Sequence, residues 1–127
     1  AWTRDAFLDL LRIRASSSLF RLRSAEEVVR RLTFHNTGPS QAPSVLVAHL
    51  DGNGLAGATF SEMVLLVNAD TVTQQLMVAA LAGKAYALHP VHGAAGAADA
   101  RAAAATYSSS SGMFSVPARP AVVFVVN

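Results

Sequence analysis

The sequence predicts a mainly β protein: an antiparallel β-sandwich preceded by two short α-helices. Helical spacing of apolar residues is confined to residues 1–31, whereas the later apolar runs are short and extended. Six or seven such runs are separated by turn residues, a pattern typical of a sandwich. The chain has 127 residues, of which 52% are hydrophobic and 14% charged. It can therefore bury one core, but it is too short for an eight-stranded α/β barrel, which needs about 250 residues.

The first predicted helix extends to about Arg14. Thr3 is expected to cap its start, and Trp2 and Phe7 are placed to form a hydrophobic staple. Residues three and four apart in a helix share a face, which here groups Phe7, Leu10, Leu11 and Arg14. The three apolar members of this group need a packing partner. Residues 16–18 are serines that end the helical pattern, and residues 19–22 form an apolar connector.

A second helix is predicted from Ser24 to about Arg31, because Ser24 and Glu27 have the spacing of a capping box. Beyond Pro43 the pattern becomes extended, and six strands are predicted at residues 44–50, 63–68, 75–78, 85–88, 114–116 and 121–126. Residues 33–35 are predicted to add a strand at the entry. The alanine-rich residues 93–105 are expected to form a loop that leads into a strand near 103–107.

The positive charge of the chain is confined to its first part. Residues 1–31 contain seven arginines and four acids, whereas residues 32–127 contain three basic and four acidic residues, for a net charge of +2. No basic stripe with interleaved aromatic residues is present, so no nucleic-acid partner is expected. No apolar run approaches the roughly 20 residues of a membrane span, so no membrane partner is expected either. There are no cysteines, which excludes disulfides and thiolate sites.

No catalytic residue is predicted. Glycoside hydrolysis needs two carboxyl groups that face each other across the scissile bond, and the acids of this chain occur in no such motif. Glu26 and Glu27 are expected to stabilise a helix N-terminus. His35 and Asn36 have no nucleophile elbow beside them, and we assign them a role in structuring a loop.

No cofactor or metal site is predicted either. His89 and His92 have a His-x-x-His spacing that could share a metal on a helix, but Pro90 argues against a helix. On a strand the two rings would point to opposite faces. Glycines 52, 54 and 57 match the Gly-x-Gly-x-x-Gly pattern of a dinucleotide loop, yet a strand rather than a helix is predicted to follow them.

Carbohydrate binding would need exposed aromatic rings that can stack on sugar faces. The aromatic residues with a polar neighbourhood are few, and Tyr107, which precedes Ser108, is the best candidate for a glucan contact. Tyr86 is the second candidate. No aromatic pair has the spacing of an extended glucan-binding surface.

Five short segments, in order, resemble the C-terminal region of pullulanase-type α-1,6-glucosidases, glycoside hydrolases of the α-amylase superfamily. They are residues 7–14 with 19–22, residues 34–39 (Phe-His-Asn-Thr-Gly-Pro), residues 81–84 (Leu-Ala-Gly-Lys), residues 88–91 (Leu-His-Pro-Val) and residues 116–119 (Val-Pro-Ala-Arg). The resemblance implies that residues 1–31 are helical material from the end of the catalytic barrel and that residues 32–127 are the C-terminal β-sandwich domain. It also implies a parent enzyme that hydrolyses α-1,6 linkages in pullulan, amylopectin or limit dextrins.

The catalytic motifs of that barrel are absent from this chain, so the resemblance predicts a non-catalytic domain that packs against the barrel of the same polypeptide and stabilises it. Three alternatives stay open: an α-glucan-binding module, a self-associating chain with Phe7, Leu10 and Leu11 in the contact, and an independent enzyme. The compartment is left open, and a secreted or cell-surface parent is compatible with the sequence. The alanine-rich loop and the serines at 108–111 depart from the family pattern.

Overall fold

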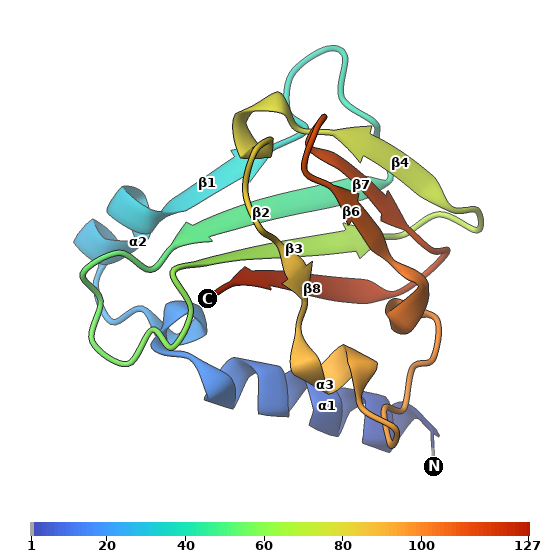
Figure 1. Ribbon diagram of the computed structural model, residues 1–127, viewed down its shortest axis with the longest axis horizontal. Helices are drawn as coiled ribbons and strands as arrows, with labels where there is room; N and C mark the ends of the chain where they lie inside the picture. The colour runs from blue at the N-terminus through green and yellow to red at the C-terminus, as the bar shows by residue number, and fades with distance from the viewer. Residues whose placement is uncertain (1) are drawn as a thin grey trace.

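The computed structural model describes residues 2–127 as two antiparallel sheets packed face to face, with a long helix across the outer side of the larger sheet (Figure 1). The helices are α1 (Trp2–Ser16), α2 (Ala25–Arg31) and α3 (Pro90–Gly93). The five-stranded sheet has the spatial order β1 (Leu32–His35), β2 (Val45–Asp51), β3 (Glu62–Asn68), β8 (Ala121–Val126) and β5 (Ala87–Leu88). The three-stranded sheet has the order β4 (Gln74–Met77), β7 (Met113–Val116) and β6 (Thr106–Ser108). Short 3₁₀ turns cover Ser18–Arg21, Ala79–Leu81 and Ala102–Ala104.

The first core lies between the two sheets. It is centred on Phe114 of β7, which is fully buried and packs at ring-centroid distances of 5.3 Å from Phe124 and 4.8 Å from Tyr107. The inner faces of β2, β3 and β8 supply aliphatic side chains to this core: Val45, Val47, Val64, Leu66 and Val122. Successive side chains of a strand point to opposite faces, so the residues between these ones lie on the outer face of the five-stranded sheet.

The second core lies on that outer face, under α1 and the 3₁₀ turn that follows it. Ile13 and Leu19 are buried there against Leu50, Met63 and Val123 of the sheet. Strand β8 contributes to both cores, which explains why its central residues form an uninterrupted apolar run: a strand that is covered on both faces has no polar side to show.

These observations confirm the predicted fold class. The start of α2 is also confirmed, because the Ser24 hydroxyl accepts a hydrogen bond from the Glu27 amide at 3.2 Å. The reciprocal half of the capping box does not form, since the Glu27 carboxylate instead pairs with Arg31 one turn later. Strand β5 is shorter than predicted, and β6 begins at Thr106, after a 3₁₀ turn rather than near residue 103.

The predicted start of the first helix is wrong. Thr3 lies inside the first turn of α1 rather than at its cap, and Trp2 is itself helical. The indole nitrogen of Trp2 donates to the carbonyl of Ala98 at 2.8 Å, and Arg101 lies 5.4 Å from its ring centroid. Trp2 therefore contacts the alanine-rich loop instead of forming the predicted staple. This contact joins residues 96 positions apart, so no local sequence pattern indicates it.

The prediction that Pro90 prevents a helix is also wrong. Pro90 is the first residue of α3, a position where proline is tolerated because its missing N–H would have no helical partner. His89 caps this helix, its Nδ1 accepting a hydrogen bond from the Val91 amide at 3.2 Å.

Candidate functional site

Most carboxylates of the described residues accept hydrogen bonds from structural partners. The Asp99 carboxylate binds Arg101, and the Asp70 carboxylate accepts from the Thr71 amide and the Gln74 side chain. The Asp9 carboxylate binds the Ala98 amide at 2.8 Å as well as Arg12, and these donors hold its pKa below the ordinary value. Asp9 and Asp99 line one common pocket, but its volume of about 50 Å³ has room for a water molecule rather than a sugar ring.

His89 and His92 join α1 and α3 to strand β8. The Ser16 hydroxyl donates to the Ile13 carbonyl at 2.6 Å, so it accepts from Nε2–H of His89 at 3.0 Å. Because Nδ1 of His89 accepts the Val91 amide, the ring is neutral with its proton on Nε2. Burial, together with a smaller contribution from the neighbouring His92, lowers the pKa of His89 to about 4.

His92 completes the hydrogen bonding of β8 where strand β5 ends. The amide of His89 donates to the Val123 carbonyl at 2.8 Å, and the Val123 amide donates to Nε2 of His92 at 3.0 Å. The His92 imidazole thus accepts the hydrogen bond that a further residue of β5 would accept if the strand continued. Burial lowers the pKa of His92, although the charges of Asp9 and Asp99 act in the opposite direction.

The two histidine rings lie with their centroids 6.5 Å apart, on one short helix and its cap. The sequence-based expectation that they point to opposite faces of a strand is therefore wrong. Among residues 2–127, no group of three or more His, Cys, Asp or Glu side chains is arranged to hold a metal ion.

Tyr86 and Tyr107, the two predicted glucan contacts, lie side by side in the first core. Tyr86 is only 7% exposed, and its ring packs edge-on against Tyr107 at 5.3 Å. The Tyr107 hydroxyl donates to the Leu81 carbonyl at 2.7 Å. Tyr107 is partly exposed, while both hydroxyls are engaged within the protein, and a glucan contact at these residues stays a prediction.

The Tyr86 hydroxyl donates to the Glu62 carboxylate, which also binds the Lys84 ammonium and Nε2 of His49. Burial alone would raise the pKa of Glu62, but its three donors outweigh this and hold it below the ordinary value. Burial raises the pKa of Tyr86, and the Glu62 carboxylate, which accepts a hydrogen bond from its hydroxyl, raises it further. This saturated cluster ties the segment before β5 to β3.

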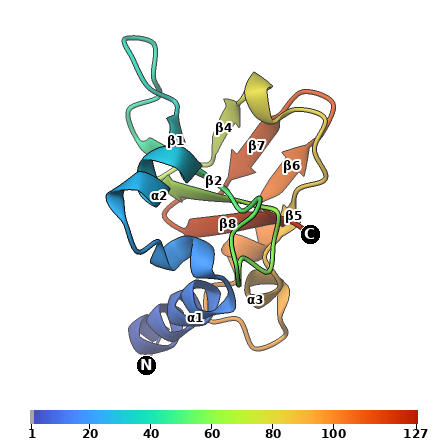
Figure 2. The ribbon, with the colours of Figure 1, turned by 90° about the vertical axis from the view of Figure 1, so that its left-hand side faces the viewer.

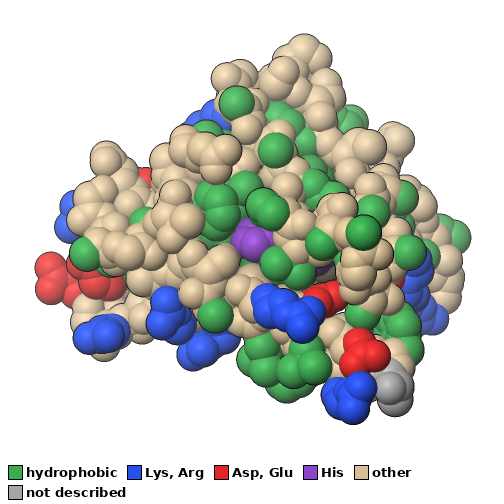
Figure 3. Space-filling view, turned by 60° about the horizontal axis from the view of Figure 1, so that its bottom comes forward, with side chains coloured by type: hydrophobic (Ala, Val, Ile, Leu, Met, Phe, Trp, Pro, Cys, Tyr) green, Lys and Arg blue, Asp and Glu red, His purple; other side chains and the backbone are tan. Residues whose placement is uncertain are grey.

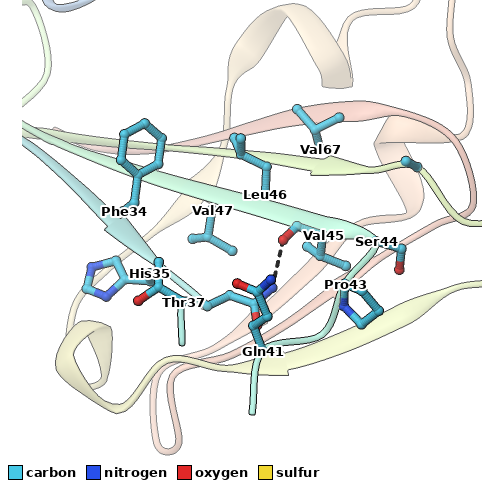
Figure 4. A pocket seen from close by; sticks show the side chains of 12 residues that line it. Phe34, His35, Thr37, Gln41, Pro43, Ser44, Val45, Leu46, Val47 and Val67 are labelled. Atoms are coloured by element: carbon cyan, nitrogen blue, oxygen red, sulfur yellow. Dashed lines mark hydrogen bonds between the residues drawn. The ribbon is translucent and has the colours of Figure 1, made fainter. Parts of the chain in front are cut away.

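Figure 4 shows a pocket of about 410 Å³ where β1 ends and strand β2 begins. Phe34, Leu46 and Val67 point to one side of β2, and Gln41 and Val47 lie on the other. The polar centre of this region is Asn36, whose side-chain amide donates to the carbonyls of Ala42 and Val45, the latter bond drawn dashed, and accepts from the Ala42 amide. Through these three hydrogen bonds the Asn36 side chain structures the loop, as predicted for this residue. The backbone of Asn36 adopts a positive φ of 55° there.

Among the described residues, a group of exposed apolar side chains lies on the outer side of the five-stranded sheet. Figure 2 shows α1 and α2 on this side, away from β4, β6 and β7. The exposed helix residues meet the sheet in two open pockets, of about 310 Å³ and 350 Å³, which share Phe20 and Leu65. We define the outer apolar surface as the large apolar side chains that border these pockets together with the exposed face of α1: Phe7, Leu10, Leu11, Phe20, Phe34, Leu46 and Leu65.

Several members of this surface are strongly exposed for their type: Phe7 is 60%, Leu11 42% and Phe34 53% exposed. Leu10 belongs both to the exposed helix face and to the first pocket, which makes the surface continuous. Figure 3 brings α1 toward the viewer and shows hydrophobic side chains gathered near the lower edge, with Lys and Arg side chains around them. Contiguous exposed apolar patches of this kind mark interaction sites.

Sequence reasoning found the helix part of this surface but missed its sheet part. Side chains alternate along β2, so Leu46 and Ala48 lie on the other face of the strand from Val45 and Val47, and all four are apolar. The apolar residues on the outer face of β2, which lies next to the edge strand β1, were the sequence signal that the sheet has a second contact face. None of the described helices is long and apolar enough to cross a membrane.

The two-sheet architecture is that of the β-sandwich found in solved pullulanases. PulA from Klebsiella oxytoca matches 93% of this chain over 11% of its own length, with a TM-score of 0.78 and 28% identity. The maltotriose complex of PulA from Klebsiella pneumoniae matches 94% of this chain over 13% of its own, with a TM-score of 0.80 and 28% identity. The chain therefore has the β-sandwich fold of the part of these pullulanases that it matches.

The family is given by the sequence itself. Residues 1–127 match the family described as alpha-1,6-glucosidases, pullulanase-type, C-terminal. Pullulanase 1, chloroplastic, of Arabidopsis thaliana is 41% identical over 130 residues, which cover 97% of this chain and 13% of that protein. The chain thus belongs to the C-terminal family of pullulanase-type α-1,6-glucosidases, and it spans 13% of the length of this relative.

Proposed function

We propose that this chain is the non-catalytic C-terminal domain of a starch-debranching enzyme and that it stabilises the catalytic barrel of the same polypeptide by packing against it. The parent enzyme would hydrolyse α-1,6 linkages in pullulan, amylopectin or limit dextrins. In this proposal residues 1–31 form the end of the barrel and residues 32–127 the domain that follows it.

The observation that carries the proposal is the outer apolar surface. The exposed side of α1 presents Phe7, Leu10 and Leu11, while the other side of the same helix is already buried against the sheet through Ile13. A helix with apolar residues on two sides is suited to packing between two bodies. One body is this sandwich, and we infer that the barrel is the other.

Chemistry by the chain itself finds no support in the site geometry. Two catalytic carboxyl groups would have to face a cleft that admits a sugar ring, about 5 to 10 Å apart. In the described residues, the Asp9, Glu62, Asp70 and Asp99 carboxylates accept hydrogen bonds from structural donors. A reducing-sugar assay of the purified chain on pullulan tests this, and the release of sugar would contradict the assignment.

Leu11→Ala tests the packing role directly when it is made both in the isolated chain and in the parent enzyme. Leu11 is 42% exposed here, so the isolated chain should lose less than about 0.5 kcal/mol of stability. If the barrel covers Leu11, the parent should lose about 2 kcal/mol or more, as for a buried leucine. Val72→Ala is the control, because Val72 is 55% exposed and lies between β3 and β4, away from α1. Equal effects of Leu11→Ala in the two proteins would refute the role.

A further inference from the structure

The segments that supply the outer apolar surface carry arginines that form no ion pair within residues 2–127. Three of the seven arginines in residues 2–31 are paired within the chain: Arg4 with Asp5, Arg12 with Asp9, and Arg31 with Glu27. The other four form no ion pair with any described residue, and all four are exposed: Arg14, Arg21, Arg23 and Arg30. The positive charge of the N-terminal segment is therefore concentrated in side chains that remain available.

Arg14 lies at the edge of the apolar side chains, and the other three arginines belong to the segments that supply those side chains. Arg14 lines the pocket formed by Leu10, Phe20 and Leu65. Arg21 and Arg23 flank Leu22, which lines the second pocket. Arg30 is on α2, the helix that supplies Val28 to the same pocket. An apolar centre with a charged rim is the usual anatomy of a protein–protein interface.

We propose that the outer apolar surface binds a partner face with an apolar centre and a rim of carboxylates, and that this face belongs to the catalytic part of the parent enzyme. This inference rests on the proposed function and adds the chemistry of the partner. Rim charges set specificity and register, because a like charge placed opposite them is unfavourable. The four arginines thus require acids from the partner at the edge of the contact.

The same charge pattern argues against a second copy of this chain as the occupant. In a two-fold symmetric dimer, the same patch of both protomers faces itself. The four arginines of one protomer would then share the interface with the four of the other, and Glu26 is the exposed acid of α2 that has no ion pair among the described residues. Self-association through Phe7, Leu10 and Leu11 would therefore place eight arginines in one contact with few acids to offset them.

The test is charge reversal in the parent enzyme, with Arg14→Glu as the variant and Arg119→Glu as the control. Arg119 is also exposed and without an ion pair among the described residues, and it lies in the turn between β7 and β8. Both substitutions change the net charge by the same amount. The readout is the rate of irreversible thermal inactivation at about 50 mM and about 1 M salt, where screening lengths differ severalfold.

We expect Arg14→Glu to accelerate inactivation about fivefold at low salt and to have little effect at high salt. Arg119→Glu should leave the rate within about twofold of the unchanged enzyme under both conditions. If Leu11→Ala destabilises the parent while Arg14→Glu does not, packing stands and the acidic rim is refuted. If neither variant has an effect, both the packing and the rim fail.

Light scattering of the isolated chain separates the remaining alternative. A chain that is a dimer at micromolar concentration, and that dissociates on Leu11→Asp, would show that a second copy can occupy the surface and would overturn the assignment to an acidic partner. A monomer whose state does not change with salt supports the partner proposed here.

Discussion

Acidification should destabilise the chain through His89, and the expected magnitude follows from its burial. The ring is 2% exposed, contacts Phe60 edge-on at 5.4 Å and uses both nitrogens as a neutral imidazole. Protonation would place a hydrogen on Nδ1, against the Val91 amide that now donates to it. His92 is the titratable group that acts on His89, and it lowers the pKa of His89. The carboxylates of Asp9 and Asp99 act on His92.

The sign follows from proton linkage. The pKa of His89 is about 4 in the folded chain and about 6.5 in the unfolded chain, so the unfolded state binds more protons between these values. The stabilisation is complete above pH 6.5 and is lost as the pH falls toward 4. At about 1.4 kcal/mol per pH unit the full loss would be about 3 kcal/mol. Water that enters around the charged ring should reduce it to about 2 kcal/mol.

The measurement is urea unfolding of the isolated chain at pH 7.5, 6, 5 and 4.5, compared with His89→Asn. Asparagine does not titrate, and its side-chain oxygen can cap α3 as Nδ1 does. The variant should be less stable at pH 7.5, because it loses the contact with Ser16, yet its stability should fall less on acidification. An equal slope in both proteins between pH 7.5 and 4.5 would refute the reasoning.

Two further predictions concern the space around Gly112 and the half-buried carboxylate of Glu62. Gly112→Ala should destabilise the chain by about 3 kcal/mol or more, since an added Cβ would lie 2.3 Å from the Val78 carbonyl oxygen. Gly83→Ala is the matched control, because Gly83 has a similar φ of 79° and open space, and thermal melting of both should show a clearly smaller loss there. Glu62→Gln should cost about 1 to 3 kcal/mol in chemical unfolding, as its three donors lose a charged acceptor. Glu26→Gln, on an exposed residue of α2, should change stability by less than about 0.5 kcal/mol, and similar losses in the two variants would contradict a structural role for the cluster.

The assignment of the glucan contact is a separate question with its own assay. Titration of the isolated chain with maltooligosaccharides should show no saturable heat if the domain acts by packing alone. Binding tighter than about 1 mM, or roughly 4 kcal/mol, would support the glucan-binding alternative. The same titration of Tyr107→Phe would then test whether the Tyr107 hydroxyl takes part in that binding, because the substitution removes the hydroxyl that donates to Leu81 but keeps the ring.

Local signals predicted most of the elements. Ser24 begins α2 because its hydroxyl satisfies a free helix amide three residues later, a contact that needs no distant partner. Strands β2, β3 and β8 were likewise predicted locally, from short apolar runs bounded by turn residues. Helix α3 was missed although a positive signal existed: proline at a first helical position favours a helix start.

The sequence by itself determined the fold class, the family and the concentration of arginines in the first 31 residues, because these depend on composition, on periodicity and on short ordered segments. The tertiary structure decided which of those features face outward. Ser16 meets His89 across 73 residues and Asp9 meets Ala98 across 89, and long-range contacts of this kind hold α1 with Ile13 buried and Leu11 exposed. Which side of a helix packs on the sheet is set by the shape of the surface that receives it, and that surface exists only after distant strands have paired.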